Sequence, residues 1–155
     1  MKIAVFSDSH GQMEYMLRAA EKEKPDAIIH LGDHITDADR LRLVFQKTPV
    51  YAVLGNCDGS LPGENKILLE LEGKRILAMH GHTCHVKSGL LTAIYTAQEA
   101  NADILLFGHT HVPLCDQSRG ILILNPGTVG RGTLKTYGII EIENGTAKCR
   151  TAIAE

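Results

Sequence analysis

Residues 2–11, Lys-Ile-Ala-Val-Phe-Ser-Asp-Ser-His-Gly, contain the pattern on which the first half of the chain is built. The apolar run over residues 2–6 predicts a buried strand, and the polar turn that ends it carries Asp8 and His10. Apolar residues then recur at helical spacing over residues 13–20. A strand, a polar turn and a helix in this order are typical of a parallel or mixed sheet with helices packed on it.

The pattern of a buried strand closed by a polar turn occurs twice more. Residues 27–31 predict a second buried strand, and Asp33 lies in the turn that follows it. Residues 50–54 predict a third strand, and the turn after it carries Asn56, Cys57 and Asp58. In such folds the functional residues collect just beyond the carboxyl ends of the strands, so these turns are the place to look for a site.

The second half of the chain adds antiparallel hairpins to this arrangement. A helix is predicted within residues 88–100 and a buried strand over residues 104–107. Three hairpins are predicted where apolar runs flank a short polar turn: residues 66–71 with 75–79, a pair within 114–124, and 137–142 with 146–152. We therefore expect one α/β domain that spans residues 1–155.

Composition and charge exclude several classes of protein. The 155 residues are 44% hydrophobic and 22% charged, which is an ordinary globular balance. With a formal net charge of −2 and no basic block, the sequence does not indicate a nucleic-acid binder. No apolar run approaches the length of a membrane span, and no leader segment precedes the first strand. The four cysteines lie far apart in the sequence, so we expect reduced thiols in a cytoplasmic protein without membrane contact.

Metal-ligating side chains follow five of the predicted strands. They are oxygen and nitrogen donors: Asp8 with His10, Asp33, Asn56, His80, and His109 with His111. Each of them alone also fits a turn or a helix cap. Together they favour Mn, Fe, Zn, Ni or Co over metals that prefer sulfur. Seven donors are too many for one four-coordinate zinc, and they suit two metal ions about 3.5–4 Å apart that share a carboxylate.

The order of these motifs resembles the calcineurin-like metallophosphoesterases. The resemblance rests on Asp8-x-His10, Gly32-Asp33, Gly55-Asn56-x-Asp58, His80 and Gly108-His109-x-His111. The chain is most similar to the small single-domain YfcE group, to which the Vps29 scaffold proteins are related. The resemblance implies a pair of packed mixed β-sheets flanked by helices, the four-layer αββα sandwich of the metallophosphoesterases.

The resemblance also implies how two divalent metal ions would be held. The first ion would take Asp8, His10 and His111 as ligands. The second would take Asn56, His80 and His109, and Asp33 would bridge the two. A hydroxide that bridges the ions would then attack phosphorus, so that the enzyme would be a phosphoesterase, with phosphodiesters expected as substrates ahead of monoesters.

One position departs from the family pattern. Many relatives carry histidine directly after the motif asparagine, where it contacts the phosphate and protonates the leaving group, but this chain has Cys57 there. Because a thiol is a poorer acid than imidazolium at neutral pH, we expect either a preference for esters with good leaving groups or another acid. His82 is the nearest sequence candidate for that acid, and Asp58 is a candidate for orienting a ligating histidine.

Two alternatives remain open from the sequence. The first is a Vps29-like protein-binding scaffold that keeps the fold with little catalysis. A site that had lost its catalytic function should also have lost metal ligands, and this chain has all seven. The second is a pair of purely structural metals, which are usually bound in closed, cysteine-rich sites. Manganese is the metal we expect first, the substrate is expected to be a small phosphate ester, and a homo-oligomer is compatible with the sequence. Arg119, Arg131 and Lys135 either contact the substrate or are solvated.

Overall fold

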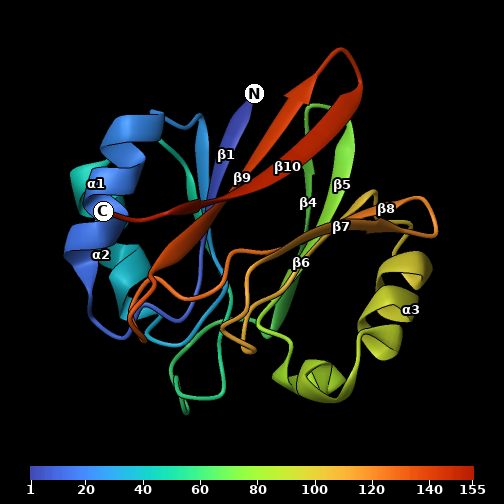
Figure 1. The fold of residues 1–155 in the computed structure, drawn as a ribbon, viewed down its shortest axis with the longest axis horizontal. Helices are drawn as coiled ribbons and strands as arrows, with labels where there is room; N and C mark the ends of the chain where they lie inside the picture. Colours follow the sequence, from blue (N-terminus) through green and yellow to red (C-terminus); the bar gives the residue numbers. More distant parts are fainter.

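The structure, a computed structural model, describes residues 1–155 as two five-stranded mixed sheets with three helices (Figure 1). The first sheet has the order β10 (Thr146–Ile153), β9 (Thr136–Glu143), β1 (Lys2–Phe6), β2 (Ala27–His30), β3 (Val50–Ala52). The second has the order β4 (Lys66–Leu71), β5 (Lys74–Met79), β6 (Ile104–Leu106), β8 (Ile121–Asn125), β7 (Leu114–Ser118). The helices are α1 (Met13–Glu23), α2 (Thr36–Val44) and α3 (Leu91–Glu99), with two 3₁₀ turns, η1 (His82–Cys84) and η2 (Val86–Ser88).

Alternating side chains of the central strands divide the molecule into four layers. In β1, Ile3 and Val5 lie in the apolar core between the sheets, whereas Ala4 and Phe6 pack with residues of α1 and α2. In β6, Ile104 and Leu106 enter the core between the sheets, while Leu105 packs with α3. The helices α1 and α2 therefore cover one outer face and α3 the other, as Figure 1 shows. This confirms the predicted αββα arrangement.

Each sheet has a parallel centre, which gives all its central strands the same carboxyl edge. In the first sheet β1, β2 and β3 are parallel, and in the second β5, β6 and β8 are parallel. The hairpin partners β9, β4 and β7 run antiparallel to their neighbours, at the positions where the sequence predicts hairpins. The turns that carry Asp8, Asp33, Asn56, His80 and His109 all leave from these carboxyl ends.

The expectation of four reduced thiols is wrong for one pair. Cys115 of β7 and Cys149 of β10 form a disulfide, with their Cα atoms 6.0 Å apart, while Cys57 and Cys84 are free. The two cysteines are 34 residues apart in the sequence, but β7 and β10 are edge strands of the two sheets and lie close together where the sheets stack. The cross-link therefore joins the two sheets. A cytoplasmic location stays a prediction and loses its argument from reduced cysteines.

The predicted helix within residues 88–100 begins later than its sequence pattern suggests. Residues Val86–Ser88 form the 3₁₀ turn η2, and the α-helix starts at Leu91. None of the helices combines the length and the apolar character that crossing a membrane requires.

Candidate metal centre

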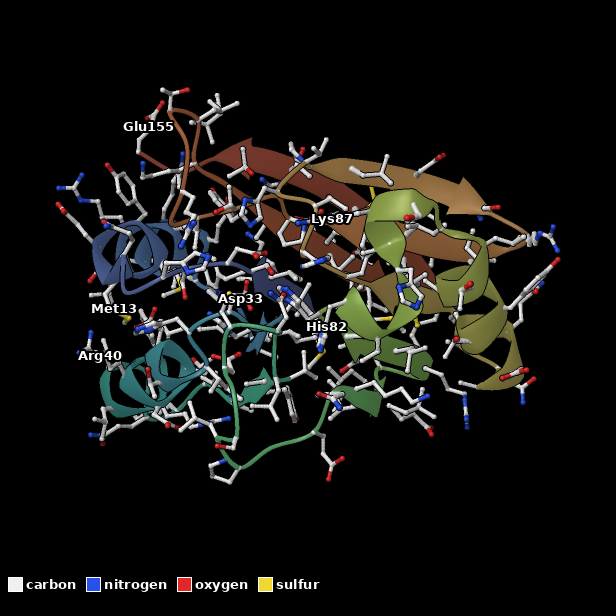
Figure 2. All side chains as sticks on the ribbon, turned by 90° about the horizontal axis from the view of Figure 1, so that it is seen from below. Met13, Asp33, Arg40, His82, Lys87 and Glu155 are labelled. Carbon is white, nitrogen blue, oxygen red and sulfur yellow. A yellow bond between two sulfur atoms is a disulfide. The ribbon has the colours of Figure 1, made fainter.

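The turns beyond β1, β2, β3, β5 and β6 meet where the carboxyl ends of the two sheets come together. Figure 2 looks at this end of the molecule, with Asp33 and His82 near its centre. Backbone hydrogen bonds continue the strand pairing into the turns, since Asp8 N donates to Gly32 O at 3.0 Å and Gly108 N donates to His80 O at 2.9 Å. The positions of the ligand-bearing turns are therefore fixed by the sheets themselves.

One group of donor atoms gathers around the first strand. Asp8, His10 and His111 each offer an atom, and these atoms lie within 4.8 Å of one another. His111 Nε2 is 2.9 Å from Asp8 Oδ1, and the rings of His10 and His111 face each other edge to face.

The remaining donors gather around His80, which is fully buried. His80 Nε2 lies 3.0 Å from Asn56 Oδ1 and 3.1 Å from His109 Nδ1. It also lies 3.5 Å from Asp33 Oδ2, and that same oxygen is 3.9 Å from His10 Nε2 in the first group. Asp8 Oδ1 also lies 3.9 Å from His80 Nε2. The structure thus brings all seven side chains together, and Asp33 and Asp8 each have an oxygen near histidines of both groups.

Each of the two carboxylates has one oxygen held by the protein and the other directed at the donors. Asp8 Oδ2 accepts hydrogen bonds from Ser7 Oγ at 2.5 Å and from His109 N at 3.2 Å, which leaves Oδ1 facing His111. Asp33 Oδ1 accepts a hydrogen bond from Cys57 N at 2.9 Å, which leaves Oδ2 facing His10 and His80. Burial would raise the pKa of Asp33, but this hydrogen bond and the nearby His80 hold the pKa below its ordinary value.

Three of the histidines are placed in ways that favour donation of a lone pair to a metal. Burial lowers the pKa of His10 and of His109, which favours the neutral form of both rings. His80 Nδ1 donates to the buried carbonyl oxygen of Leu31 at 2.7 Å. That bond fixes the tautomer and leaves the lone pair of His80 Nε2 pointing into the donor group.

Backbone strain is concentrated in the same residues. Asp8, His10, Asp33, His109 and His111 all have positive φ angles, between 46° and 68°, a region that residues other than glycine rarely adopt. Most of the other non-glycine residues with positive φ lie at helix ends or hairpin turns, where this conformation is ordinary. Five strained residues that share one donor cluster point to a constraint set by function.

The chemistry of the donor set fits metal ions. The lone pair of His80 Nε2 faces the carbonyl oxygen of Asn56 and a carboxylate oxygen of Asp33, neither of which can donate a hydrogen bond to it. His10 Nε2 is buried and has no hydrogen-bond partner. Cations between these atoms would remove the repulsion and satisfy the lone pairs, so the residues present fit two divalent ions.

Comparison with known proteins decides the family. The model of the calcineurin-like phosphoesterase superfamily domain matches residues 1–145. The chain belongs to this superfamily. It is 33% identical to the probable metallophosphoesterase YsnB of Bacillus subtilis over 97% of this chain and 89% of that one. It is 28% identical to the phosphodiesterase YfcE of Escherichia coli over 91% and 88% of the two chains. The crystal structure of a conserved Streptococcus pneumoniae protein, described as a predicted phosphoesterase, superposes with a TM-score of 0.83 at 31% identity over 99% and 89% of the chains.

In this metallophosphoesterase the carboxylate of Asp58 binds backbone N–H groups, whereas the sequence suggests that it orients a ligating histidine. Its Oδ2 accepts from the backbone N–H groups of Gly55 and Asp33 at 2.7 and 3.0 Å, and its Oδ1 from those of His34 and Ile35, both at 2.8 Å. No ring nitrogen is among these donors, and the carboxylate is buried. Asp58 therefore fixes the turn that carries Asp33.

Cys57 and His82 lie beside the donor cluster. The Cys57 thiol is exposed and accepts a long contact of 3.6 Å from Asn56 Nδ2, and burial and the Asp33 carboxylate raise its pKa. The ring centroid of His82 is 5.5 Å from that of His80, and its Nδ1 is buried without a partner. Burial and the neighbouring His80 lower the pKa of His82.

The residues that hold the ligand turns in place are not predicted from the sequence. Asn125 Nδ2 donates to Gly108 O at 3.2 Å and to Thr110 Oγ1 at 2.8 Å, which braces the turn between the last two histidines. Thr128 Oγ1 donates to Asp8 O at 3.0 Å. Both lie in the segment after β8, whose Asn-Pro-Gly-Thr sequence reads as an ordinary turn. The one feature of the sequence that could have indicated this role is that the segment directly follows the end of the parallel strand β8.

Substitution of the histidines in pairs tests how the ligands are divided. We expect His10→Ala/His111→Ala to keep about one divalent ion per chain, because both losses fall on one ion of the roughly two that such sites hold. His10→Ala/His109→Ala should lose most of both ions. The measurement is elemental analysis of metal-loaded protein after gel filtration.

The exposed His85 serves as the control, since His85→Asn removes an imidazole near the site that contacts no donor atom. It should bind as much metal as the wild type. Equal metal loss in the two paired variants would show that all the histidines hold one shared ion.

Proposed function

We propose that the chain is a phosphodiesterase that uses two divalent metal ions to hydrolyse small phosphate esters. The observation that carries this proposal is the convergence of seven oxygen and nitrogen donors at the joined carboxyl ends of two sheets. Two ions bound there supply a hydroxide nucleophile at neutral pH and compensate negative charge on the phosphoryl oxygens. Manganese is the metal we propose first, on the basis of the hard and borderline ligands.

The proposed ligand division follows the two groups of atoms. Asp8, His10 and His111 would hold one ion, and Asn56, His80 and His109 would hold the other. Asp33 would be shared by both, because its free Oδ2 lies 3.9 Å from His10 Nε2 and 3.5 Å from His80 Nε2. Asp58 supports this arrangement by fixing the backbone on either side of Asp33.

The side chains around the site favour attack by water over a covalent intermediate. Ser7 Oγ donates to Asp8 Oδ2, and Ser9 Oγ bonds to Asp37 at 2.7 Å and to His30 Nε2 at 2.8 Å, so both hydroxyls are committed to buried partners. Cys57 has no histidine within hydrogen-bond distance that could act as its base. The protein therefore supplies position and charge, and the nucleophile comes from solvent.

The preference for diesters rests on the similar YfcE protein, which is named a phosphodiesterase.

A separate argument concerns the leaving group. Cys57 stands at the position from which an imidazole would protonate the leaving group in many relatives, so esters with acidic leaving groups are favoured. His82 is our second candidate for that acid, because its ring lies beside His80.

Replacement of the bridging carboxylate tests the proposed function. Asp33→Asn removes one negative charge between the ions and should lower kcat/KM for aryl phosphodiesters by at least about 100-fold, because a neutral amide binds two cations more weakly than a carboxylate. The measurement is metal-dependent release of nitrophenol from a diester and a monoester, with Glu143→Gln on the exposed end of β9 as a charge-matched control.

If the wild-type protein shows no metal-dependent turnover, the result would favour a protein-binding scaffold over a phosphoesterase. Full activity of Asp33→Asn would show that Asp33 does not bridge the metals.

Restoring an imidazole at position 57 tests the leaving-group argument. Cys57→His should raise kcat/KM for alkyl esters relative to aryl esters, because poor leaving groups need protonation more than good ones. The gain should fade as the pH rises above the usual imidazole pKa, about 6.5, since only the protonated ring is an acid. An unchanged ratio of aryl to alkyl rates between the two proteins would contradict the argument.

A further inference from the structure

Arg131 stands on a segment that is packed directly against the turn of Asp8 and His10. After β8 the chain passes Thr128, whose Oγ1 donates to Asp8 O at 3.0 Å and accepts from Arg131 N at 3.0 Å. Val129 N donates to Ser7 O at 3.2 Å. A Cβ atom on Gly130 would come within 2.0 Å of Ser9 O, so only glycine permits this approach. The backbone of Arg131 is therefore held at the edge of the metal centre.

The side chain of Arg131 starts beside the donor cluster. A Cβ atom on Gly130, the residue before it, would also come within 2.7 Å of Asp8 O, and Thr128 Oγ1 links Arg131 N to that same carbonyl oxygen. Asp8 Oδ1 in turn lies 2.9 Å from His111 Nε2. The long side chain of Arg131 therefore extends from a backbone position next to the metal ligands.

Arg131 is the one arginine whose side chain makes no ion pair, hydrogen bond or cation–π contact within the chain. The other six pair with carboxylates, donate to backbone carbonyls or cover an aromatic ring: Arg18, Arg40, Arg42, Arg75, Arg119 and Arg150. The exposed Arg131 side chain makes no ion pair and no hydrogen bond. In the same segment, Lys135 Nζ donates to Gly132 O at 3.0 Å and lies 5.1 Å from the centre of the Tyr15 ring.

An uncommitted guanidinium beside a metal centre is suited to one class of partner. Its planar array of donors matches the oxygens of a phosphate group, and its charge persists at any physiological pH. The carboxylates nearby are already engaged, Asp8 and Asp33 at the donor cluster and Asp58 with four backbone groups. No carboxylate nearby is left to pair with Arg131, so its guanidinium is free to bind a group from outside the chain.

We propose that Arg131 binds the phosphoryl group of the substrate, and so sets the affinity of the site for phosphate esters. This rests on the proposed function for the identity of the substrate. In that role Arg131 supplies the cationic contact that Cys57 cannot make.

The test compares Arg131→Gln and Arg131→Lys with Lys135→Gln, a variant that removes a positive charge from the same segment but away from the site. Two quantities are measured on metal-loaded protein: the dissociation constant of inorganic phosphate by calorimetry, and KM and kcat for an aryl phosphodiester. Metal content is determined for every variant.

Arg131→Gln should weaken phosphate binding about tenfold and raise KM by a similar factor, with kcat changed much less, because the contact exists before the transition state. Arg131→Lys should restore part of the loss, since it keeps the charge without the planar donors. Lys135→Gln should match the wild type. The calorimetric result separates this proposal from the proposed function, because it needs no turnover.

Phosphate affinity and KM that are unchanged in Arg131→Gln would overturn the proposal while leaving the phosphoesterase assignment intact. Loss of metal from Arg131→Gln would also overturn it, because the residue would then maintain the centre and not bind the substrate. If the wild type binds phosphate through Arg131 but hydrolyses no ester, the anion site stands and the proposed function fails.

Discussion

The hydrogen bond from His80 Nδ1 to the carbonyl oxygen of Leu31, 2.7 Å long and fully buried, ties the second sheet to the first at their carboxyl ends. It satisfies a carbonyl at the end of β2, and a buried carbonyl left unpaired would cost about 1–3 kcal/mol. The same bond decides which nitrogen of His80 carries the proton, so that Nε2 presents its lone pair to Asn56, Asp33 and His109. One contact thus fixes both the docking of the sheets and the electronic state of the central ligand.

The turn between His109 and His111 depends on how closely the sheets approach. A Cβ atom on Gly108 would lie 2.0 Å from Ser7 Oγ and 3.0 Å from Asp8 Oδ2, so a side chain at this position would push the two ligand turns apart. With glycine there, His109 N reaches Asp8 Oδ2, and the two histidine rings diverge toward different donor groups. This divergence requires a left-handed backbone conformation at both histidines, and the packing of the two sheets maintains that conformation.

The sequence predicted the parts of the molecule that depend on local patterns. Strands such as β1 and the hairpin of β9 with β10 follow from apolar runs and turn residues, and the ligand positions follow because each comes directly after such a strand. Interactions between distant segments could not be seen in this way. The disulfide of Cys115 depends on how two sheet edges stack, and three of the four backbone bonds of Asp58 depend on the path of a turn more than 20 residues away. In the sequence Arg131 is not distinguished from the other basic residues. In the structure its neighbours pack against the Asp8 turn.

If the seven donors hold two ions close enough to share Asp33, titration of the metal-free protein with Mn²⁺ will show magnetic coupling between them in electron paramagnetic resonance. We expect binding to saturate at about two ions per chain. The six-line signal of isolated Mn²⁺ should give way to an exchange-coupled spectrum, as expected for ions about 3.5–4 Å apart. Saturation at one ion, or two ions that keep uncoupled signals, would contradict a shared bridging carboxylate.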